Sequence, residues 1–363
     1  MKKHPYMGYE ESAFWKRSVA MKAISEVDPV SPFPFRITKA DKVATAGSCF
    51  AQHISRKLKE IGFNFYVTED AHPVIRSKAQ SGNYGIYSAR YGNIYTARQL
   101  VQLFHRAYGN FNPKDDVWTI DEGALVDAFR PTIQEHGFRT WEELYQDRQQ
   151  HYEAVRKCFE GLDYFVFTLG LTECWISKQD GAVYPVCPGV SGGAFDDSKY
   201  EFKNFRVDEV VSDFEEFIGL LRSVNPAAKI ILTVSPVPLA ATASGKHVLA
   251  ATTLSKSVLR VAAEEICNKD PNTFYFPSYE IITGAYARGN YYAQDLRTVT
   301  EPGVNHVMSL FVMHGTDVAD AHAKGESVGS TKDDAVSESF ISEMKGMIDV
   351  MCDETALDPE NNP

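Results

Sequence analysis

Short apolar runs alternate with longer segments of helical periodicity along most of the chain. The runs 43–46, 164–169 and 229–234 are made of β-branched, aromatic or small residues, and the last two end at a Gly or Pro breaker. Continuous apolar runs of this length are typical of central parallel strands that are covered on both faces. Residues 274–276 form another short strand candidate.

The segments between these runs carry apolar residues at helical spacing. After the first run, such residues recur at Phe50, Ile54, Leu58 and Ile61. Two longer segments, 207–223 and 249–266, show the same pattern, and Asn225-Pro226 would end the first of them. Strands alternating with helices predict βαβ units in a doubly wound, mostly parallel α/β sheet, with the site at the carboxyl ends of the strands.

The ends of the chain differ from this pattern. Residues 1–40 mix aromatic, charged and Pro-rich stretches, which predicts an arm packed on the core. We expect one α/β domain over 41–315. Residues 316–363 lose apolar periodicity and predict a C-terminal extension with one helix over 337–352 and a loose end.

Composition narrows the functional classes. A net charge of −11 and a pI near 5.4 oppose binding to phosphate backbones, so no nucleic-acid partner is expected. No apolar stretch marks a signal peptide or a transmembrane segment. The six cysteines are scattered without a C-x-x-C pair, which predicts reduced thiols and a cytoplasmic protein. Nucleotide-binding and zinc-binding patterns do not occur, so no cofactor and no metal are expected.

The sharpest local feature is the sequence Gly47-Ser48-Cys49-Phe50-Ala51. It places Ser48 where a predicted strand gives way to a predicted helix. A hydroxyl there lies above the carboxyl edge of the sheet, beside helical N–H groups that stabilise an oxyanion. The alternative is a serine that only caps the helix.

These five residues spell the signature of the GSCFA family, and the chain resembles that family in order over roughly residues 5–315. Further segments that resemble family blocks are Tyr91-Gly92-Asn93-Ile94-Tyr95, Thr168-Leu169-Gly170-Leu171-Thr172-Glu173, Thr233-Val234-Ser235-Pro236-Val237 and Phe276-Pro277-Ser278-Tyr279-Glu280. The family is grouped with SGNH hydrolases, so the resemblance implies an SGNH-hydrolase-like three-layer sandwich.

The resemblance also implies a catalytic set with Ser48 as nucleophile and a late Asp and His. In the SGNH pattern the His follows the Asp by three positions, but here Thr298 stands three residues after Asp295. We therefore take His306 as the candidate base, near the start of a predicted helix, with Asp295 orienting its imidazole. His53 and His314 are further candidates.

The resemblance further implies an oxyanion hole and substrate contacts after successive strands. The SGNH pattern has an Asn after the third-block glycine, whereas Gly170 is followed by Leu171. Another hydrogen-bond donor must therefore replace this Asn in the oxyanion hole. Glu173 would position a substrate hydroxyl or an arginine such as Arg90. The candidates are Cys49, Gly92, Asn93, Thr172 and Glu173.

The sequence contains two other candidate nucleophiles besides Ser48. Cys49 stands at a helix start, where thiol pKa values fall, but its side chain would point about 100° away from that of Ser48. Residues 189–193 satisfy the G-x-S-x-G pattern, yet no apolar strand precedes them and no helix follows. We interpret that segment as a mobile loop, with a lid over the cleft as its alternative role.

Two functions are compatible with this site. In the first, Ser48 carries acyl-ester chemistry as an O-acyl esterase or O-acetyltransferase on a carbohydrate or polysaccharide, with an acyl donor as a second partner. The resemblance implies a setting in bacterial polysaccharide or capsule assembly. In the second, the chain is a non-catalytic carbohydrate-binding or assembly protein. Sugar-stacking candidates are Tyr84, Tyr87, Tyr91 and Tyr95.

Overall fold

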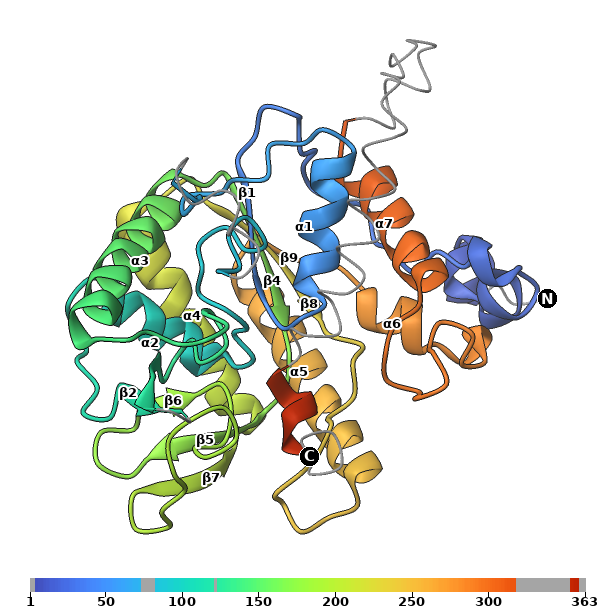
Figure 1. Ribbon diagram of the computed structural model, residues 1–363. Coiled ribbons are helices and arrows are strands. Elements are labelled where there is room, and N and C mark those ends of the chain that lie inside the picture. Colours follow the sequence, from blue (N-terminus) through green and yellow to red (C-terminus); the bar gives the residue numbers. More distant parts are fainter. Residues whose placement is uncertain (1–3, 73–81, 121–122, 318–352, 359–363) are drawn as a thin grey trace, which may run out of the picture. The chain divides into compact units, whose positions relative to one another are not determined.

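The computed structural model describes residues 4–72, 82–120, 123–317 and 353–358 (Figure 1). The described residues form two compact units. The sheet unit comprises residues 39–275 with 353–358, and the helical unit comprises residues 4–38 with 276–317. Each unit is described by itself.

A four-stranded parallel sheet is the centre of the sheet unit (Figure 1). Its strands, in spatial order, are β1 (Val43–Gly47), β4 (Tyr164–Leu169), β8 (Lys229–Val234) and β9 (Thr273–Tyr275). Every residue of β1 and β4 is buried, as expected of strands covered on both faces. The predicted strands at 43–46, 164–169, 229–234 and 274–276 are thus confirmed, the last shifted by one residue.

The chain that follows β1 first pairs with one edge of this strand, near Phe65, and later with its other edge, through β4. An isolated parallel bridge joins Val43 to Phe65, on the edge of β1 that does not pair with β4. The strand order therefore reverses at β1, with β4, β8 and β9 following in sequence away from it. This is the switch point of a doubly wound sheet, where ligands bind beyond the carboxyl ends of the strands.

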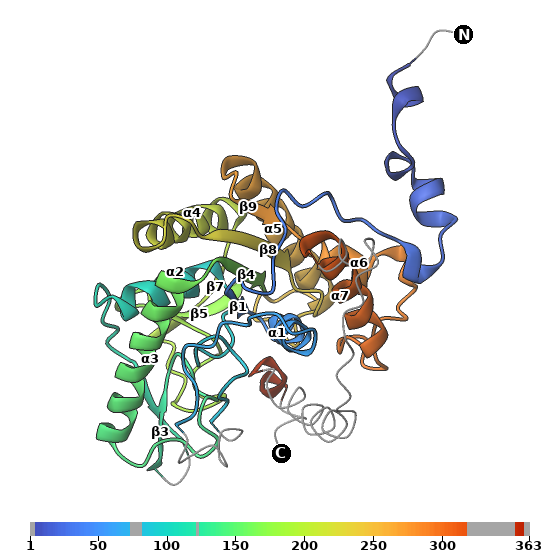
Figure 2. The same cartoon turned by 90° about the horizontal axis from the view of Figure 1, so that it is seen from above.

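Helices cover both faces of this sheet. Helix α1 (Ala51–Glu60) packs on β1 and β4, and α4 (Val207–Val224) lies on the opposite side (Figure 2). The other helices of the unit are α2 (Ala97–Ala107), α3 (Trp141–Gly161) and α5 (Val248–Lys269). Phe165 and Phe167 of β4 pack against Phe159, Phe214 and Phe217 of α3 and α4, with ring centroids 5.5–5.9 Å apart.

Two small antiparallel sheets complete the sheet unit. They comprise β2 (Val117–Thr119) with β3 (Leu125–Asp127), and β6 (Val183–Tyr184), β5 (Glu173–Ser177) and β7 (Tyr200–Asn204). A buried cluster that includes Trp118 and Tyr184 joins the two sheets. The 189–193 segment is a loop, as predicted, and Gly193 lies against the Trp118 ring.

The helical unit is built from both ends of the fold. It contains α6 (Ser278–Thr283), α7 (Glu301–Gly315), and the short turns Pro5–Gly8, Glu11–Ala13, Lys16–Ala20, Ile24–Glu26 and Ala285–Ala287. Phe33 packs on Phe276 and Phe311, and the Ile37 amide donates to the Gly315 carbonyl at 2.8 Å. The N-terminal segment is therefore fixed on α7.

The helices predicted at 50–61, 207–223 and 249–266 are confirmed as α1, α4 and α5. The helix predicted over 337–352 lies outside the described residues. The predicted division into 1–40, 41–315 and 316–363 stays a prediction, since compact units defined by contacts are not by themselves folding domains.

We predict that Gly47→Ala destabilises the protein by at least about 2 kcal/mol. Gly47 has φ +128°, and a Cβ there would lie 2.7 Å from the Thr168 amide nitrogen and closer still to its carbonyl oxygen. Urea unfolding measures the effect. Gly219→Ala is the control, because this exposed glycine of α4 has open space around it and the change should stabilise by up to about 1 kcal/mol. Equal stability of the Gly47→Ala variant and the parent would refute the close-contact argument.

Candidate functional site

Ser48 follows directly on β1 at the carboxyl edge of the sheet. Gly47, in register with Thr168, allows the chain to turn there, and the Ser48 amide donates to the Thr168 carbonyl at 3.2 Å. Gly170 approaches from the end of β4, and a Cβ at position 170 would lie 3.1 Å from the Ser48 Cβ. The ends of β1 and β4 thus hold Ser48 at the switch point of the sheet.

The Ser48 hydroxyl is buried, and its Oγ makes no hydrogen bond within the described residues. Helix α1 has Phe50 at its N-cap, without any side-chain capping bond. The alternative that Ser48 is a helix cap is therefore wrong. An unsatisfied buried hydroxyl costs about 1–3 kcal/mol, and a native protein keeps such a group for a reason other than stability.

A small cavity of about 10 Å³ lies in front of Ser48, with room for roughly one water molecule. Segments that follow three adjacent strands line it, together with the 92–95 loop, α5 and the C-terminal turn Asp353–Leu357. The lining residues are Ser48, Cys49, Tyr95, Gly170, Leu171, Ser235, Val237, Pro238, Leu239, Lys256 and Glu354. Cys49, predicted as an oxyanion donor, lies in this cavity.

The loop at 92–95 runs beside the end of β1. Gly92 has φ +68°, and the Ile94 amide donates to the Gly47 carbonyl at 2.8 Å. The Asn93 side chain is buried and accepts from the Gln52 amide of α1 at 3.3 Å. Asn93 lines a neighbouring cavity rather than that of Ser48. Tyr95 is the loop residue that lines the Ser48 cavity.

A buried ionic network fixes the start of this loop. The Arg90 amide donates to the Glu69 carboxylate at 2.7 Å, and its guanidinium binds Glu69 at 3.4 Å and Asp147 at 2.6 Å. Arg130 also binds Asp147, at 2.8 Å, and donates to the Arg90 carbonyl. Because these charges are buried and mutually paired, the backbone that leads to Gly92 has little freedom.

Thr172 and Glu173 lie near the end of β4 but are engaged elsewhere. The Thr172 hydroxyl donates to Asn204 at 2.7 Å and contacts the Ser255 hydroxyl at 3.1 Å. The Glu173 carboxylate accepts from Thr242 at 2.8 Å, whereas Arg90 belongs to the ionic network. Burial raises the pKa of Glu173. The contact suggested between Glu173 and Arg90 is therefore wrong.

His306 lies one turn into α7, as predicted, in the helical unit. It is buried, and its Nδ1 is 2.7 Å from the Tyr291 hydroxyl. Its Nε2 makes no hydrogen bond within the described residues. If Nδ1 carries the proton and donates it to Tyr291, Nε2 holds the lone pair that a general base needs. Burial lowers the pKa of His306, with smaller opposing effects of the Val27 backbone and the Asp28 carboxylate.

Asp295 belongs to the helical unit as well, but it does not contact His306 there. Its carboxylate accepts from the Arg297 amide at 3.0 Å and from the Thr298 amide and hydroxyl at 2.9 and 2.6 Å. Thr298, which stands where the resemblance led us to expect a histidine, therefore closes the Asp295 turn. Tyr291 makes the contact that we expected of Asp295.

Sequence reasoning overlooked Lys256 and Tyr291. Lys256 lies on the buried side of α5 with Leu259 and Ala263, so a charged residue on a largely apolar helix face was the available signal. Ser235 follows β8, and its position at a strand end was also visible in the sequence. No local pattern indicated Tyr291.

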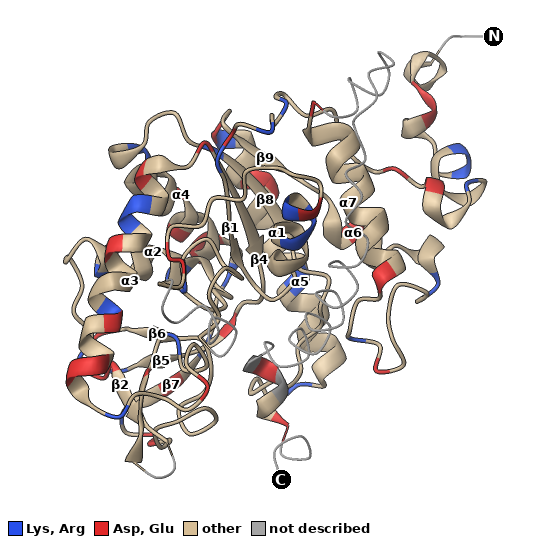
Figure 3. Cartoon of the chain, turned by 45° about the horizontal axis from the view of Figure 1, so that its top comes forward, with Lys and Arg blue, Asp and Glu red and all other residues tan. Residues whose placement is uncertain are grey.

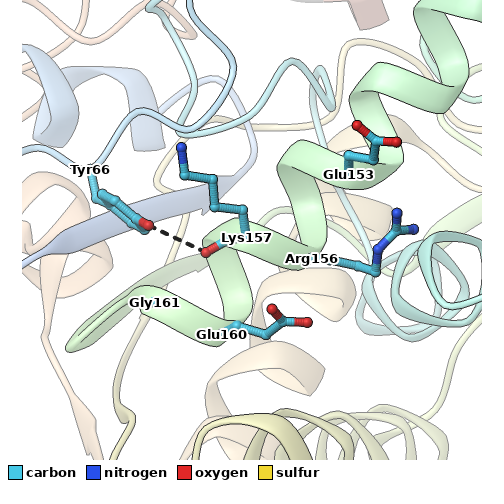
Figure 4. A pocket seen from close by; sticks show the side chains of 6 residues that line it. All are labelled: Tyr66, Glu153, Arg156, Lys157, Glu160 and Gly161. Atoms are coloured by element: carbon cyan, nitrogen blue, oxygen red, sulfur yellow. Dashed lines mark hydrogen bonds between the residues drawn. The ribbon is translucent and has the colours of Figure 1, made fainter.

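A second pocket, of about 440 Å³, opens at the other edge of the sheet (Figure 4). It is lined by Tyr66, Glu153, Arg156, Lys157, Glu160 and Gly161. The Tyr66 amide bonds to Val43 at the amino end of β1, and Gly161 precedes β4. Because ligands of doubly wound sheets bind at the carboxyl edge, the pocket at Ser48 is the better candidate.

Other features of the described residues bear on the binding partners. No cluster of three or more His, Cys, Asp or Glu side chains suited to a metal occurs among them. Within the same residues, no helix has the length and apolarity needed to cross a membrane. The five cysteines of the described part form no disulfide. Acidic and basic side chains are interspersed, for example along α3 (Figure 3).

The fold and the site define a doubly wound α/β protein whose switch point holds a buried serine hydroxyl without a hydrogen-bond partner among the described residues. The chain belongs to the GSCFA family, whose family model matches residues 42–311. No curated protein matches the sequence. A similar solved structure is a carbohydrate esterase family 3 protein from Talaromyces cellulolyticus, with 11% sequence identity, a TM-score of 0.28, and coverage of 80% of this chain and 100% of that chain.

We predict that Glu69→Gln lowers the free energy of unfolding at pH 7 and that this difference shrinks in acid. Burial alone would raise the pKa of Glu69, but His151, Arg130 and Arg90 lower it to about 2. A lowered folded pKa gives stability that is present above the unfolded value of 4.5 and is lost as pH falls towards 2. The shift corresponds to about 3 kcal/mol.

Urea unfolding at pH 7, 4 and 3 tests this. Glu201→Gln, which removes an exposed carboxylate of β7, should match the parent at every pH. A Glu69→Gln deficit that is the same at pH 7 and pH 3 would contradict the assignment of the Glu69 charge.

Proposed function

We propose that the chain catalyses acyl-ester chemistry on a carbohydrate or polysaccharide through an acyl-serine at Ser48. The observation that carries the proposal is the Ser48 hydroxyl, which is buried at the switch point, faces a cavity and has no hydrogen-bond partner among the described residues. No described protein group occupies this hydroxyl, so it is accessible to an acyl group in the cavity, and the base has to reach it when substrate is bound. Membership of the GSCFA family supports the same assignment.

In the proposed reaction, Ser48 Oγ attacks the acyl carbon and its proton passes to His306 Nε2. The new bond joins Oγ to the acyl carbon, and the bond to the sugar oxygen breaks as that oxygen takes the proton from His306. Water then attacks the acyl-serine in an esterase, and a second sugar hydroxyl attacks it in an O-acetyltransferase. Either attack regenerates Ser48.

When Ser48 attacks, negative charge develops on the acyl oxygen, and hydrogen-bond donors must stabilise it. We assign the charge-stabilising role to the backbone amide of Cys49, which lines the Ser48 cavity, and to the Gly92-Asn93 loop, which leads to Tyr95 in the wall of that cavity. In this proposal Thr172 supports the wall of the cavity, and Glu173 positions a substrate hydroxyl. For Asp295 we propose a role in shaping the loop that precedes α7.

We predict that a fluorophosphonate probe labels Ser48 and that Ser48→Ala loses both labelling and ester cleavage, the latter by at least about a thousandfold. Mass spectrometry of the labelled peptide identifies the site. Ser235→Ala is the matched control, since Ser235 lines the same cavity but its Oγ accepts from the Val237 amide at 3.3 Å. Labelling that survives in Ser48→Ala, or a chain that takes no label, would favour the non-catalytic carbohydrate-binding alternative.

We predict an acid limb in the pH profile of kcat/KM with its midpoint below 6.5. Burial lowers the pKa of His306 below the ordinary histidine value of 6.5, so the neutral imidazole that acts as base is lost only at lower pH. His306→Asn should remove this limb together with most of the activity, whereas His314→Asn, on the same helix, should keep it. A midpoint above 6.5 would exclude His306 as the base.

A further inference from the structure

Four arginines of the described residues are buried, and they differ in what balances their charge. Arg90, Arg130 and Arg148 each form ion pairs with two carboxylates. Arg106 of α2 is 8% exposed and forms no ion pair with the described residues. Charged side chains are almost never buried unpaired, because removing a charge from water costs several kcal/mol. The charge of Arg106 therefore lacks the balance that the other three have.

The contacts that Arg106 does make are with neutral groups. Its Nε donates to the Gln102 carbonyl at 3.4 Å, its Cζ lies 3.9 Å from the centroid of the Phe129 ring, and its guanidinium donates to the Tyr152 hydroxyl. Asp127 attracts it from a distance, but the Asp127 carboxylate binds other arginines. Burial lowers the pKa of Arg106, and Tyr152 and Asp127 offset only part of that effect.

Arg106 lines a small cavity of about 10 Å³ beside the 92–95 loop. Arg130 and Gln99 line it as well, and no Asp or Glu occurs among the described residues of its wall. Gln99 Oε1 accepts from the Tyr95 amide at 3.0 Å, which fixes the orientation of the side-chain amide. The NH₂ group of Gln99 bonds to none of the described residues, so it is the polar group that Gln99 offers to the cavity.

The chemistry of this wall suits an anion. A guanidinium without a carboxylate and an amide NH₂ group both donate hydrogen bonds, and bonds from a cation to an anion are about twice as strong as neutral ones. A cation would be repelled by Arg106, and a water molecule would accept a hydrogen bond but leave the charge unbalanced. The cavity has room for roughly one water-sized particle, which suits a monatomic anion and is smaller than a carboxylate or a phosphate.

We propose that this cavity is a halide site, in which chloride accepts hydrogen bonds from the Arg106 guanidinium and the Gln99 NH₂ group and balances the charge of Arg106. The site goes beyond the proposed function and does not depend on it. Gln99 also holds the backbone of Tyr95, the loop residue that lines the Ser48 cavity. Bound chloride therefore stabilises the loop that leads to the serine.

The first experiment follows thermal unfolding while chloride replaces gluconate at constant ionic strength. A ligand that binds only the folded chain raises Tm, and we expect a rise of about 2–4 °C that levels off as the site fills. Arg106→Met should abolish the saturable rise, because no charge is left to balance. Arg98→Met is the matched control and should keep it, since Arg98 lies on the same helix but pairs with Asp213 outside the cavity.

A second variant supplies the missing negative charge within the chain. Gln99→Glu keeps an oxygen for the Tyr95 amide and places a second carboxylate oxygen where the NH₂ group was. We expect its Tm to be independent of chloride and, in gluconate, to be no lower than that of the parent. This comparison tests the proposal even if Arg106→Met fails to fold.

The third experiment locates the ion in the unsubstituted chain. Crystals soaked in sodium bromide should show an anomalous difference peak between Arg106 and Gln99. No peak there overturns the proposal. A peak without a saturable chloride effect on Tm means binding at crystal concentration only and overturns it as well. The same holds if Arg106→Met or Gln99→Glu responds to chloride as the parent does.

Discussion

The close approach of two strand ends determines the geometry of the site. At position 47, a side chain would meet the backbone of Thr168, and at position 170 it would press on Ser48 and Tyr95. Glycine at both places lets β1 and β4 keep their parallel register up to the point where the chain leaves the sheet. The position of Ser48 is consequently set by close packing of the backbone at the two strand ends.

A second constraint acts on the loop that faces the serine. Glu69, Arg90, Asp147 and Arg130 pair in the protein interior, and Arg90 uses backbone as well as side-chain groups in these pairs. Replacing such a network by apolar residues is often neutral or favourable for stability, so its retention points to a requirement for one defined loop conformation. The hydrogen bond from Ile94 to Gly47 then transmits that conformation to the end of β1.

The sequence allowed the sheet and the serine to be predicted because both leave local signals. The runs 164–169 and 229–234 are apolar at every position or nearly so, and Ser48 directly follows such a run. The antiparallel sheets were missed, since strands as short as Val183–Tyr184 have no measurable periodicity. Contacts such as Tyr291 with His306, or Glu354 in the Ser48 cavity, depend on tertiary packing between segments that carry no pattern of their own.

The composition of the helical unit has a consequence for how the chain folds. Arg36 hydrogen-bonds to the carbonyl of His314 across 278 residues, so the N-terminal segment finds its partners only after residues 39–275 of the sheet unit have been synthesised. Closing a loop of this length costs conformational entropy, which slows folding. The strands within residues 39–275, in contrast, all pair with strands of the same continuous stretch. On the ribosome residues 39–275 are therefore expected to fold first, and Phe33 and its apolar neighbours stay exposed until α7 has been synthesised.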